Sequence, residues 1–162
     1  MIYVTSDLHF GHDREFLFKP RGFTNIADHD ETIVKNWNSI VKEDDDVYVL
    51  GDLMLNDNDR GLSLIKQLRG KLHVILGNHD TNARIALYKT CYNIVDVTYA
   101  TVLSYKGQMF YLSHYPTIVG DITHERRPKN LLYNLYGHTH QDTNFYNDIF
   151  FIYHVGLDSH EN

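Results

Sequence analysis

The pattern of apolar and polar positions predicts alternating strands and helices in the first half of the chain. Short apolar runs, typical of buried strands, occupy residues 1–5, 47–50 and 72–76. Between and after them, apolar residues recur every three to four positions and predict helices at 28–41, 58–69 and 81–90. Asp28 or Asp30 is the expected cap of the first helix, and Gly70 the end of the second.

The second half of the chain is predicted to be mostly strand. Strands are expected at 94–99, 101–105, 109–113 and 131–136, followed by a hairpin at 144–155. Lys106-Gly107 and Asn147-Asp148 are the expected turns of two hairpins. Segments 10–27 and 115–130 have no clear period and are predicted loops. With no repeat or linker, the pattern favours an α/β fold of layered sheets, organised as a single domain over residues 1–162.

Composition and charge exclude several classes of protein. The 162 residues carry a net charge of −6, and an acidic surface disfavours extended nucleic-acid binding. Cys91 is the only cysteine, so an intramolecular disulfide is excluded. The N-terminus lacks the pattern of a signal peptide, and no apolar run approaches the ~18 residues of a membrane span. We therefore expect no membrane association, and a cytoplasmic location.

Polar side chains follow five of the predicted strands directly. The 11 histidines do not form a tract, and many stand beside Asp, Asn or Gly. The groups at these strand ends that can bind a metal are Asp7, His9, Asp52, Asn78, His114, His138 and His140. Taken singly, each of these histidines also fits an ordinary turn residue. Five clusters at five strand ends indicate one shared site, because ligands bind at the carboxyl edge of an open α/β sheet.

The donor types indicate which metals would bind. Oxygen and imidazole donors without thiolates suit first-row cations such as Mn²⁺, Fe²⁺, Ni²⁺ or Zn²⁺. Seven donors are too many for one tetrahedral zinc, but they fit two metals if one carboxylate bridges them. Asp52, central in the order of the donors, is the natural bridge. Paired cations of this kind recur in phosphoryl chemistry.

These motifs together resemble the calcineurin-like metallophosphoesterases, over residues 5 to about 156. The matching motifs are Asp7-x-His9, Gly51-Asp52, Gly77-Asn78-His79-Asp80, His114 and Gly137-His138-x-His140. Further motifs resemble a small, single-domain bacterial and phage group: Gly11-His12, Arg21-Gly22-Phe23, Asn36-Trp37-Asn38 and His114-Tyr115-Pro116. The resemblance implies a four-layer α/β/β/α sandwich with two divalent metal ions at its edge, Mn²⁺ being the first expectation.

The resemblance also implies a role for each residue of the site. Metal one would be held by Asp7, His9, Asp52 and His140, and metal two by Asp52, Asn78, His114 and His138. His79 would face the substrate, stabilise phosphoryl oxygens and act as general acid. Asp80 would either orient a neighbouring group or serve as a plain helix cap.

The expected reaction is hydrolysis of a small phosphate ester by a hydroxide held between the two metals. We favour a phosphodiesterase acting on nucleotide-type diesters. A phosphomonoesterase acting on a small metabolite or nucleotide is the alternative, and a non-catalytic metal-binding module the remote one. The run Asp59-Arg60-Gly61 has the wrong spacing from Asp52 for the protein-phosphatase branch.

Substrate contacts are expected from a few side chains near the motifs. His12 stands three residues after His9, and Tyr115 directly follows His114 and could stack on a base. Arg14, Arg21, Arg126 and Arg127 are further candidates for phosphate contact, although solvated surface charge is the better interpretation of Arg126 and Arg127. The loops 10–27 and 115–130 are expected to set specificity.

Overall fold

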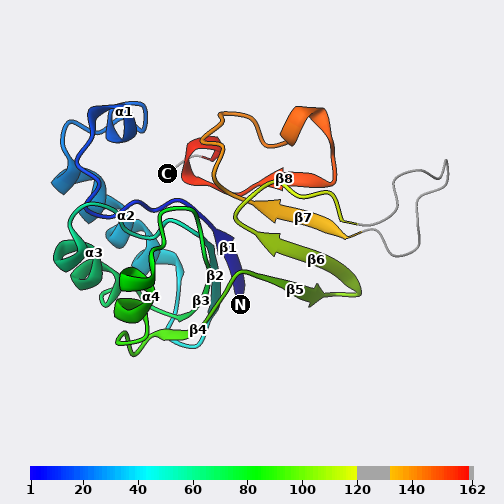
Figure 1. Ribbon diagram of the computed structural model, residues 1–162, viewed down its shortest axis with the longest axis horizontal. Coiled ribbons are helices and arrows are strands. Elements are labelled where there is room, and N and C mark those ends of the chain that lie inside the picture. The colour runs from blue at the N-terminus through cyan, green and yellow to red at the C-terminus, as the bar shows by residue number, and fades with distance from the viewer. Residues whose placement is uncertain (120–131, 161–162) are drawn as a thin grey trace.

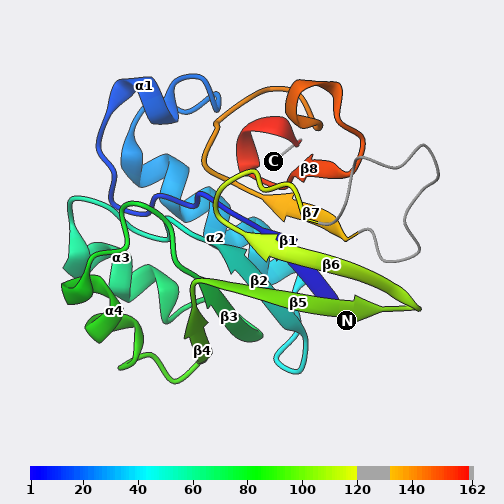
Figure 2. The same ribbon diagram turned by 45° about the vertical axis from the view of Figure 1, so that its right-hand side comes forward.

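The computed structural model describes residues 1–119 and 132–160 of the chain. Two four-stranded sheets pack face to face, and helices cover the outer face of the first sheet (Figures 1 and 2). Within the described ranges, no helix is long and apolar enough to cross a membrane.

The first sheet is entirely parallel. Its strands, in spatial order, are β1 (Ile2–Thr5), β2 (Asp46–Leu50), β3 (Lys71–Ile75) and β4 (Ile94–Thr98). The helices on its outer face are α2 (Ile26–Ile40), α3 (Asn58–Ile65) and α4 (Asn82–Tyr88). Trp37 of α2 and Tyr88 of α4 belong to the same buried cluster as Val49 and Val74 of the sheet. Every strand in this sheet therefore ends at the same edge.

The second sheet combines one hairpin with parallel strands. Its strands are β5 (Ala100–Tyr105), β6 (Gln108–Ser113), β7 (Tyr133–Tyr136) and β8 (Ile152–His154). The predicted turn at Lys106-Gly107 is confirmed: both residues have positive φ, as a tight hairpin turn requires. Leu50 and Ile75 of the first sheet pack with Leu112 of the second in the core between the sheets.

The predicted α/β sandwich of the metallophosphoesterase type is confirmed. Among the described residues, short segments and no long helix cover the outer side of the second sheet. The Asn134 amide oxygen accepts a hydrogen bond from the Thr117 backbone at 2.7 Å. Tyr136 contacts Tyr146 of the 3₁₀ turn η1 (Tyr146–Asp148), with ring centroids 5.9 Å apart.

Several predicted boundaries need correction. The predicted loop 10–27 contains a short helix, α1 (Glu15–Phe18). Helix α2 begins at Ile26, and the Asn25 side chain caps it by accepting from the Asp28 backbone, so neither Asp28 nor Asp30 is the cap. Helix α3 ends at Ile65, earlier than predicted.

The predicted final hairpin is largely wrong. Asn147 and Asp148 do turn the chain with positive φ, but the arm before them contributes only one antiparallel bridge, from Phe145 to Tyr153. Strand β8 pairs in parallel with β7 instead. Its apolar alternation fits either partner, so the sequence pattern could not distinguish them.

Candidate metal centre

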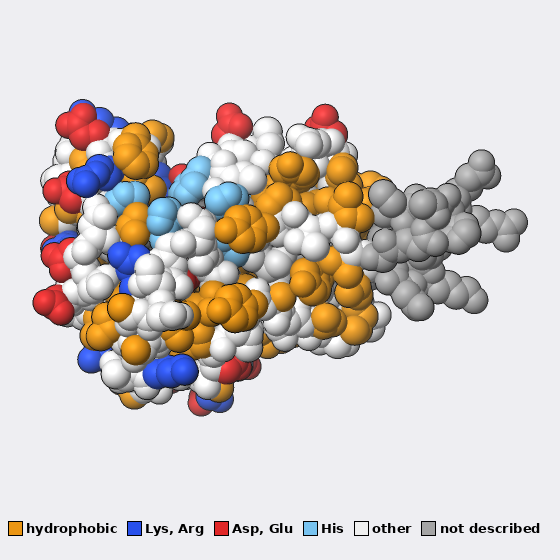
Figure 3. All heavy atoms as spheres, viewed as in Figure 1, with side chains coloured by type: hydrophobic (Ala, Val, Ile, Leu, Met, Phe, Trp, Pro, Cys, Tyr) orange, Lys and Arg blue, Asp and Glu red, His pale blue; other side chains and the backbone are white. Residues whose placement is uncertain are grey.

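The structure brings all seven predicted ligands together at one edge of the sandwich. Each lies just after a strand: Asp7 and His9 after β1, Asp52 after β2, Asn78 after β3, His114 after β6, and His138 and His140 after β7. Both sheets therefore supply donors. A group of histidine side chains is visible on this face (Figure 3).

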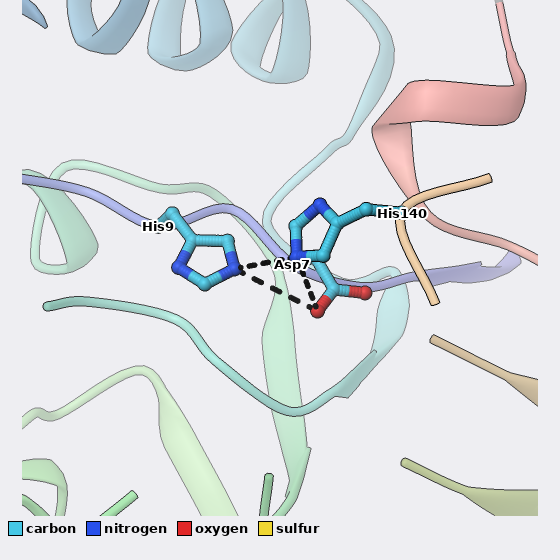
Figure 4. Close-up of side chains that lie close together, drawn as sticks. All are labelled: Asp7, His9 and His140. Carbon is cyan, nitrogen blue, oxygen red and sulfur yellow. Dashed lines mark hydrogen bonds and ion pairs between the residues drawn. The ribbon is translucent and has the colours of Figure 1, made fainter. Parts of the chain in front are cut away.

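Asp7, His9 and His140 form the first group of donors (Figure 4). The Nε2 atoms of the two histidines are 3.1 Å apart, and each lies 3.8 Å from Asp7 Oδ1. Asp7 Oδ1 is buried and has no hydrogen-bond partner among the residues that the structure describes. A buried carboxylate oxygen without a donor is costly, and a cation held between these three atoms would compensate it. The arrangement therefore fits a divalent metal.

Asn78, His114 and His138 form the second group, with Asp52 between the two. Asn78 Oδ1 lies 2.8 Å from His114 Nε2 and 2.9 Å from His138 Nδ1. Asp52 Oδ2 lies 3.7 Å from His114 Nε2 and 3.9 Å from His9 Nε2. Asp7, Asp52 and His114 also lie within mutual ligand distance. Both carboxylates thus stand between the groups, and the bridging role of Asp52 remains a prediction.

Hydrogen bonds to the far ring nitrogens orient two of these histidines. His114 Nδ1 lies 2.8 Å from the Leu50 carbonyl oxygen, and His140 Nδ1 lies 2.7 Å from Asp158 Oδ2. Because a carbonyl or carboxylate only accepts, each Nδ1 carries a proton. In a neutral ring Nε2 is then left with a lone pair toward the site, as in metal centres generally.

The electrostatics of the metal-free protein also favour a cation. Burial lowers the pKa of His9 strongly, with His140 adding to the effect, so the His9 ring is neutral. Burial raises the pKa of Asp52 to about 6; His114 opposes this shift, and the nearby Asp7 carboxylate adds to it. Two buried carboxylates beside the neutral ring of His9 are a charge pattern that a bound divalent ion offsets.

The backbone is strained at most of the ligands. Positive φ angles occur at Asp7, His9, Asp52, His138 and His140. Such angles are uncommon outside glycine, cost on the order of 1–3 kcal/mol each, and cluster at functional sites. Glycines give these side chains room, because a Cβ at Gly77 would collide with Asp52 and one at Gly137 with Asp7.

His79 lies beside both groups but belongs to neither. Its backbone N–H donates to Asp52 Oδ1 at 3.0 Å, and its carbonyl accepts from Arg84. Its ring centroid is 5.9 Å from that of His9. The side chain faces a cavity of about 490 Å³ that His9, Asp52 and Asn78 also line. A second cavity, of about 220 Å³ between β1 and α2, contains none of the predicted ligands.

Asp80 holds the ends of two strands together. Its Oδ2 accepts from the backbone of Asp52 at 3.0 Å and of Gly77 at 2.7 Å, while Oδ1 accepts from the Tyr88 hydroxyl at 2.6 Å. Thr81 caps α4, so the interpretation of Asp80 as a plain helix cap is wrong. Asp80 instead positions the backbone of Asp52, a predicted ligand.

Arg21 does not lie where a substrate contact would need it. Its guanidinium is buried and donates to both carboxylate oxygens of Asp158, at 2.8 and 3.0 Å, and to the Asp7 carbonyl at 3.0 Å. Its remaining nitrogen faces His29 Nε2 at 3.1 Å. With every nitrogen engaged inside the protein, Arg21 supports the site from behind, and the predicted phosphate contact is not supported.

The other predicted contacts lie around the cavity or away from it. His12 lines the cavity, with its ring 5.2 Å from that of His9, and burial together with His79 lowers its pKa to about 4. Tyr115 is half-exposed, with its ring 4.6 Å from His138. Arg14 is bonded to the Asp13 carbonyl on the surface. Arg126 and Arg127 fall outside the described residues.

Sequence reasoning missed Asp158. It follows β8 in the run Gly156-Leu157-Asp158, and Gly156 forms a parallel bridge with Ser6, next to the predicted ligand Asp7. Bonds from His140 and Arg21 lower the pKa of Asp158, although burial alone would raise it. A glycine and a carboxylate after a strand repeat the pattern of Gly51-Asp52. That signal was present but was hidden by the misassigned hairpin.

Comparisons with known proteins agree with this geometry. The chain is 30% identical over 159 residues to the gene 66 protein of Mycobacterium phage D29, covering 86% of this chain and 78% of that protein. It is 41% identical over 81 residues to an uncharacterized protein of Methanocaldococcus jannaschii, covering 49% of this chain and 46% of that protein. A match to the gene 66 protein of Mycobacterium phage L5 is 39% identical over 82 residues. These last two matches span less than half of those relatives' lengths.

Solved structures share the fold at low identity. A protein of unknown function from Aquifex aeolicus superimposes with a TM-score of 0.68 at 23% identity, covering 98% of this chain and 90% of that one. A novel archaeal phosphodiesterase superimposes with a TM-score of 0.54 at 15% identity, covering 96% of this chain and 81% of that one.

The family model of the calcineurin-like phosphoesterase superfamily domain matches residues 1–156 of the chain. The chain therefore belongs to the calcineurin-like phosphoesterase superfamily, whose members are metal-dependent hydrolases of phosphate esters.

Proposed function

We propose that this protein is a phosphodiesterase that hydrolyses small nucleotide-type diesters with two divalent metal ions. One observation carries the proposal. Seven oxygen and imidazole donors converge from both sheets around Asp7 Oδ1, which has no hydrogen-bond partner among the described residues, and the imidazole of His79 faces the adjoining cavity. A purely structural metal site has no use for an unligated histidine at its mouth. The family membership and the fold of an archaeal phosphodiesterase support the same class of activity.

The cavity's charge favours a diester over a monoester. Among the described residues that line it, none is Lys or Arg. A diester carries one negative charge, whereas a monoester carries close to two at neutral pH and needs more compensation. The phosphomonoesterase alternative is therefore second, and the assay below distinguishes the two.

The side chains at the site would have different roles in hydrolysis. Bound divalent cations would supply positive charge that activates water and offsets charge on the phosphoryl oxygens. The two donor groups and Asp52 would hold these cations, and the phosphate would bind beside them at the mouth of the cavity. His79, anchored through its backbone to Asp52 Oδ1, would donate to a phosphoryl oxygen and give a proton to the leaving oxygen. The leaving group then departs into the cavity.

The first test compares two chromogenic esters with the Mn²⁺-reconstituted protein. We expect bis-p-nitrophenyl phosphate to be hydrolysed with higher kcat/KM than p-nitrophenyl phosphate. His79→Ala should lower kcat by about 10²–10³-fold, because it removes a donor used in the transition state. Elemental analysis of the same variant should still find the wild-type metal content.

Each other outcome has a definite meaning. Preference for the monoester would replace the diesterase with the phosphomonoesterase. Loss of metal together with activity in His79→Ala would contradict the role given to His79. Binding of two metals with no turnover of either ester would contradict the proposed enzyme and favour a metal-binding module.

A further inference from the structure

One wall of the cavity at the metal centre is apolar. Phe16, Leu17, Pro20 and Leu55 line it beside the polar groups His12 and His79. The Phe16 and His12 rings meet edge to face, with centroids 5.6 Å apart. This apolar wall, defined by those four residues, adjoins the site at which the phosphate would be held.

The fold itself does not require a phenyl ring at position 16. The neighbouring Leu17 and Phe18 are buried and anchor the single turn α1 to the protein. Phe16 is 72% exposed, so it adds little to the core. An exposed aromatic ring at the mouth of a polar cavity is typical of a ligand-binding surface.

The described lining of the same cavity has no cationic side chain that could bind additional phosphate groups. None of its described lining residues is Lys or Arg. Two guanidinium groups near the site are already bonded within the protein: Arg21 to Asp158, and Arg84 to Asn58 and the His79 carbonyl. A second phosphate at the apolar wall would lie without a cationic partner, against hydrophobic side chains.

We infer that the apolar wall selects substrates in which a single phosphoryl group is attached next to a planar ring, and that it rejects polyphosphates. This inference rests on the proposed function and names the substrate class for that site. The ring would pack against Phe16 while the phosphoryl group lies beside the cations that the two donor groups would hold. A plain aryl ring and a nucleobase share this chemistry.

Competitive inhibition tests the inference by comparing compounds that bind the site, with hydrolysis of a single ester serving only as the reporter. With bis-p-nitrophenyl phosphate as reporter and constant free Mn²⁺, we expect phenylphosphonate to bind about tenfold tighter than methylphosphonate. Phe16→Ala should reduce that ratio to about twofold or less, and Phe16→Leu should keep part of it. Tyr92→Ala is the matched control. Tyr92 is 80% exposed and lies just before β4 begins, at the edge of the first sheet opposite the candidate metal centre. It should keep the wild-type ratio.

A second series identifies the source of the ring and tests the exclusion of polyphosphates. AMP should inhibit about tenfold better than ribose 5-phosphate, and ADP no better than AMP. Selectivity for phenylphosphonate without selectivity for AMP would support the wall and assign it to an aryl group.

Two results would overturn the inference while leaving the proposed function intact. The first is that the reporter is hydrolysed but phenylphosphonate and AMP inhibit no better than methylphosphonate and ribose 5-phosphate. The second is that ADP inhibits at least tenfold more strongly than AMP. Absence of any hydrolysis in the metal-loaded protein would instead refute the proposed function.

Discussion

At the scale of single residues, the site depends on side chains that hold the ligands as much as on the ligands. His140 has its Nδ1 fixed by Asp158, and Asp158 is fixed by Arg21. Arg21 also donates to the backbone carbonyl of Asp7. This chain of hydrogen bonds thus positions two members of the first donor group, Asp7 and His140.

Asp158→Asn tests that chain. The amide can turn its nitrogen toward His140 Nδ1, which would then accept a hydrogen bond and carry no proton. The proton of the neutral ring would move to Nε2, which could then no longer bind a metal. Loss of such an outer partner commonly lowers metal affinity by about 10–100-fold. Titration calorimetry with Mn²⁺ should show this loss at one of the two sites. Asp142→Asn, an exposed change nearby, should bind as the wild type does. Equal affinities in both variants would contradict a positioning role for Asp158.

Asp52→Asn tests the charge stored in the metal-free site. The pKa of Asp52 is about 6 in the folded protein, above the ordinary value of about 3.9 for an unfolded chain. The folded state therefore holds the proton more tightly, and the free energy of unfolding falls as pH rises from about 4 to about 6. Because the Asp52→Asn variant has no carboxylate to titrate at this position, its free energy of unfolding does not fall with pH for this reason. Urea unfolding of metal-free protein should show its advantage over wild type growing by about 1 kcal/mol between pH 5 and pH 8. An advantage that is the same at both pH values would refute the argument.

At the scale of elements, the sequence pattern predicted most of the site because one rule governs it. Parallel strands such as β1, β2 and β3 end at the same edge, so polar groups following each strand must meet. The rule needs only the strand ends, which strong apolar runs define well. It places Asp7 next to Asp52 although 45 positions separate them in the chain. The prediction of the ligand positions therefore did not depend on exact boundaries.

Where the pattern was weak, the prediction failed. Helix α1 has only four residues, too few to show a helical period, and tertiary packing of Leu17 and Phe18 holds it. Strand β8 has three residues, and its partner could not be read from its alternation. Because this strand was misassigned, Asp158, which follows it, was not predicted as part of the site. Charge type was also insufficient for Arg21, because only the structure shows that its partners are inside the protein.

At the scale of the whole molecule, the candidate metal centre draws its residues from both sheets. Asp7, His9, Asp52 and Asn78 follow strands of the first sheet, whereas His114, His138 and His140 follow strands of the second. Between the sheets, the core elsewhere consists of apolar side chains such as Leu50 and Leu112. At this edge, buried carboxylates and imidazoles replace that packing. A bound cation would therefore stabilise the contact between the sheets as well as serve the reaction.

Metal addition should consequently raise the melting temperature of the protein. A ligand that binds only the folded state adds about 2.7 kcal/mol at 100 times its dissociation constant. For a chain of this size, 1 kcal/mol corresponds to roughly 2–4 °C. We expect a rise of about 5–10 °C with Mn²⁺ in a thermal scan, reversed by a chelator. Asp52→Asn, which weakens both donor groups, should lose most of this rise. A full rise in that variant would show that the stabilising ion binds elsewhere, and no rise in the wild type would show that the two sheets do not need the ion to hold this edge together.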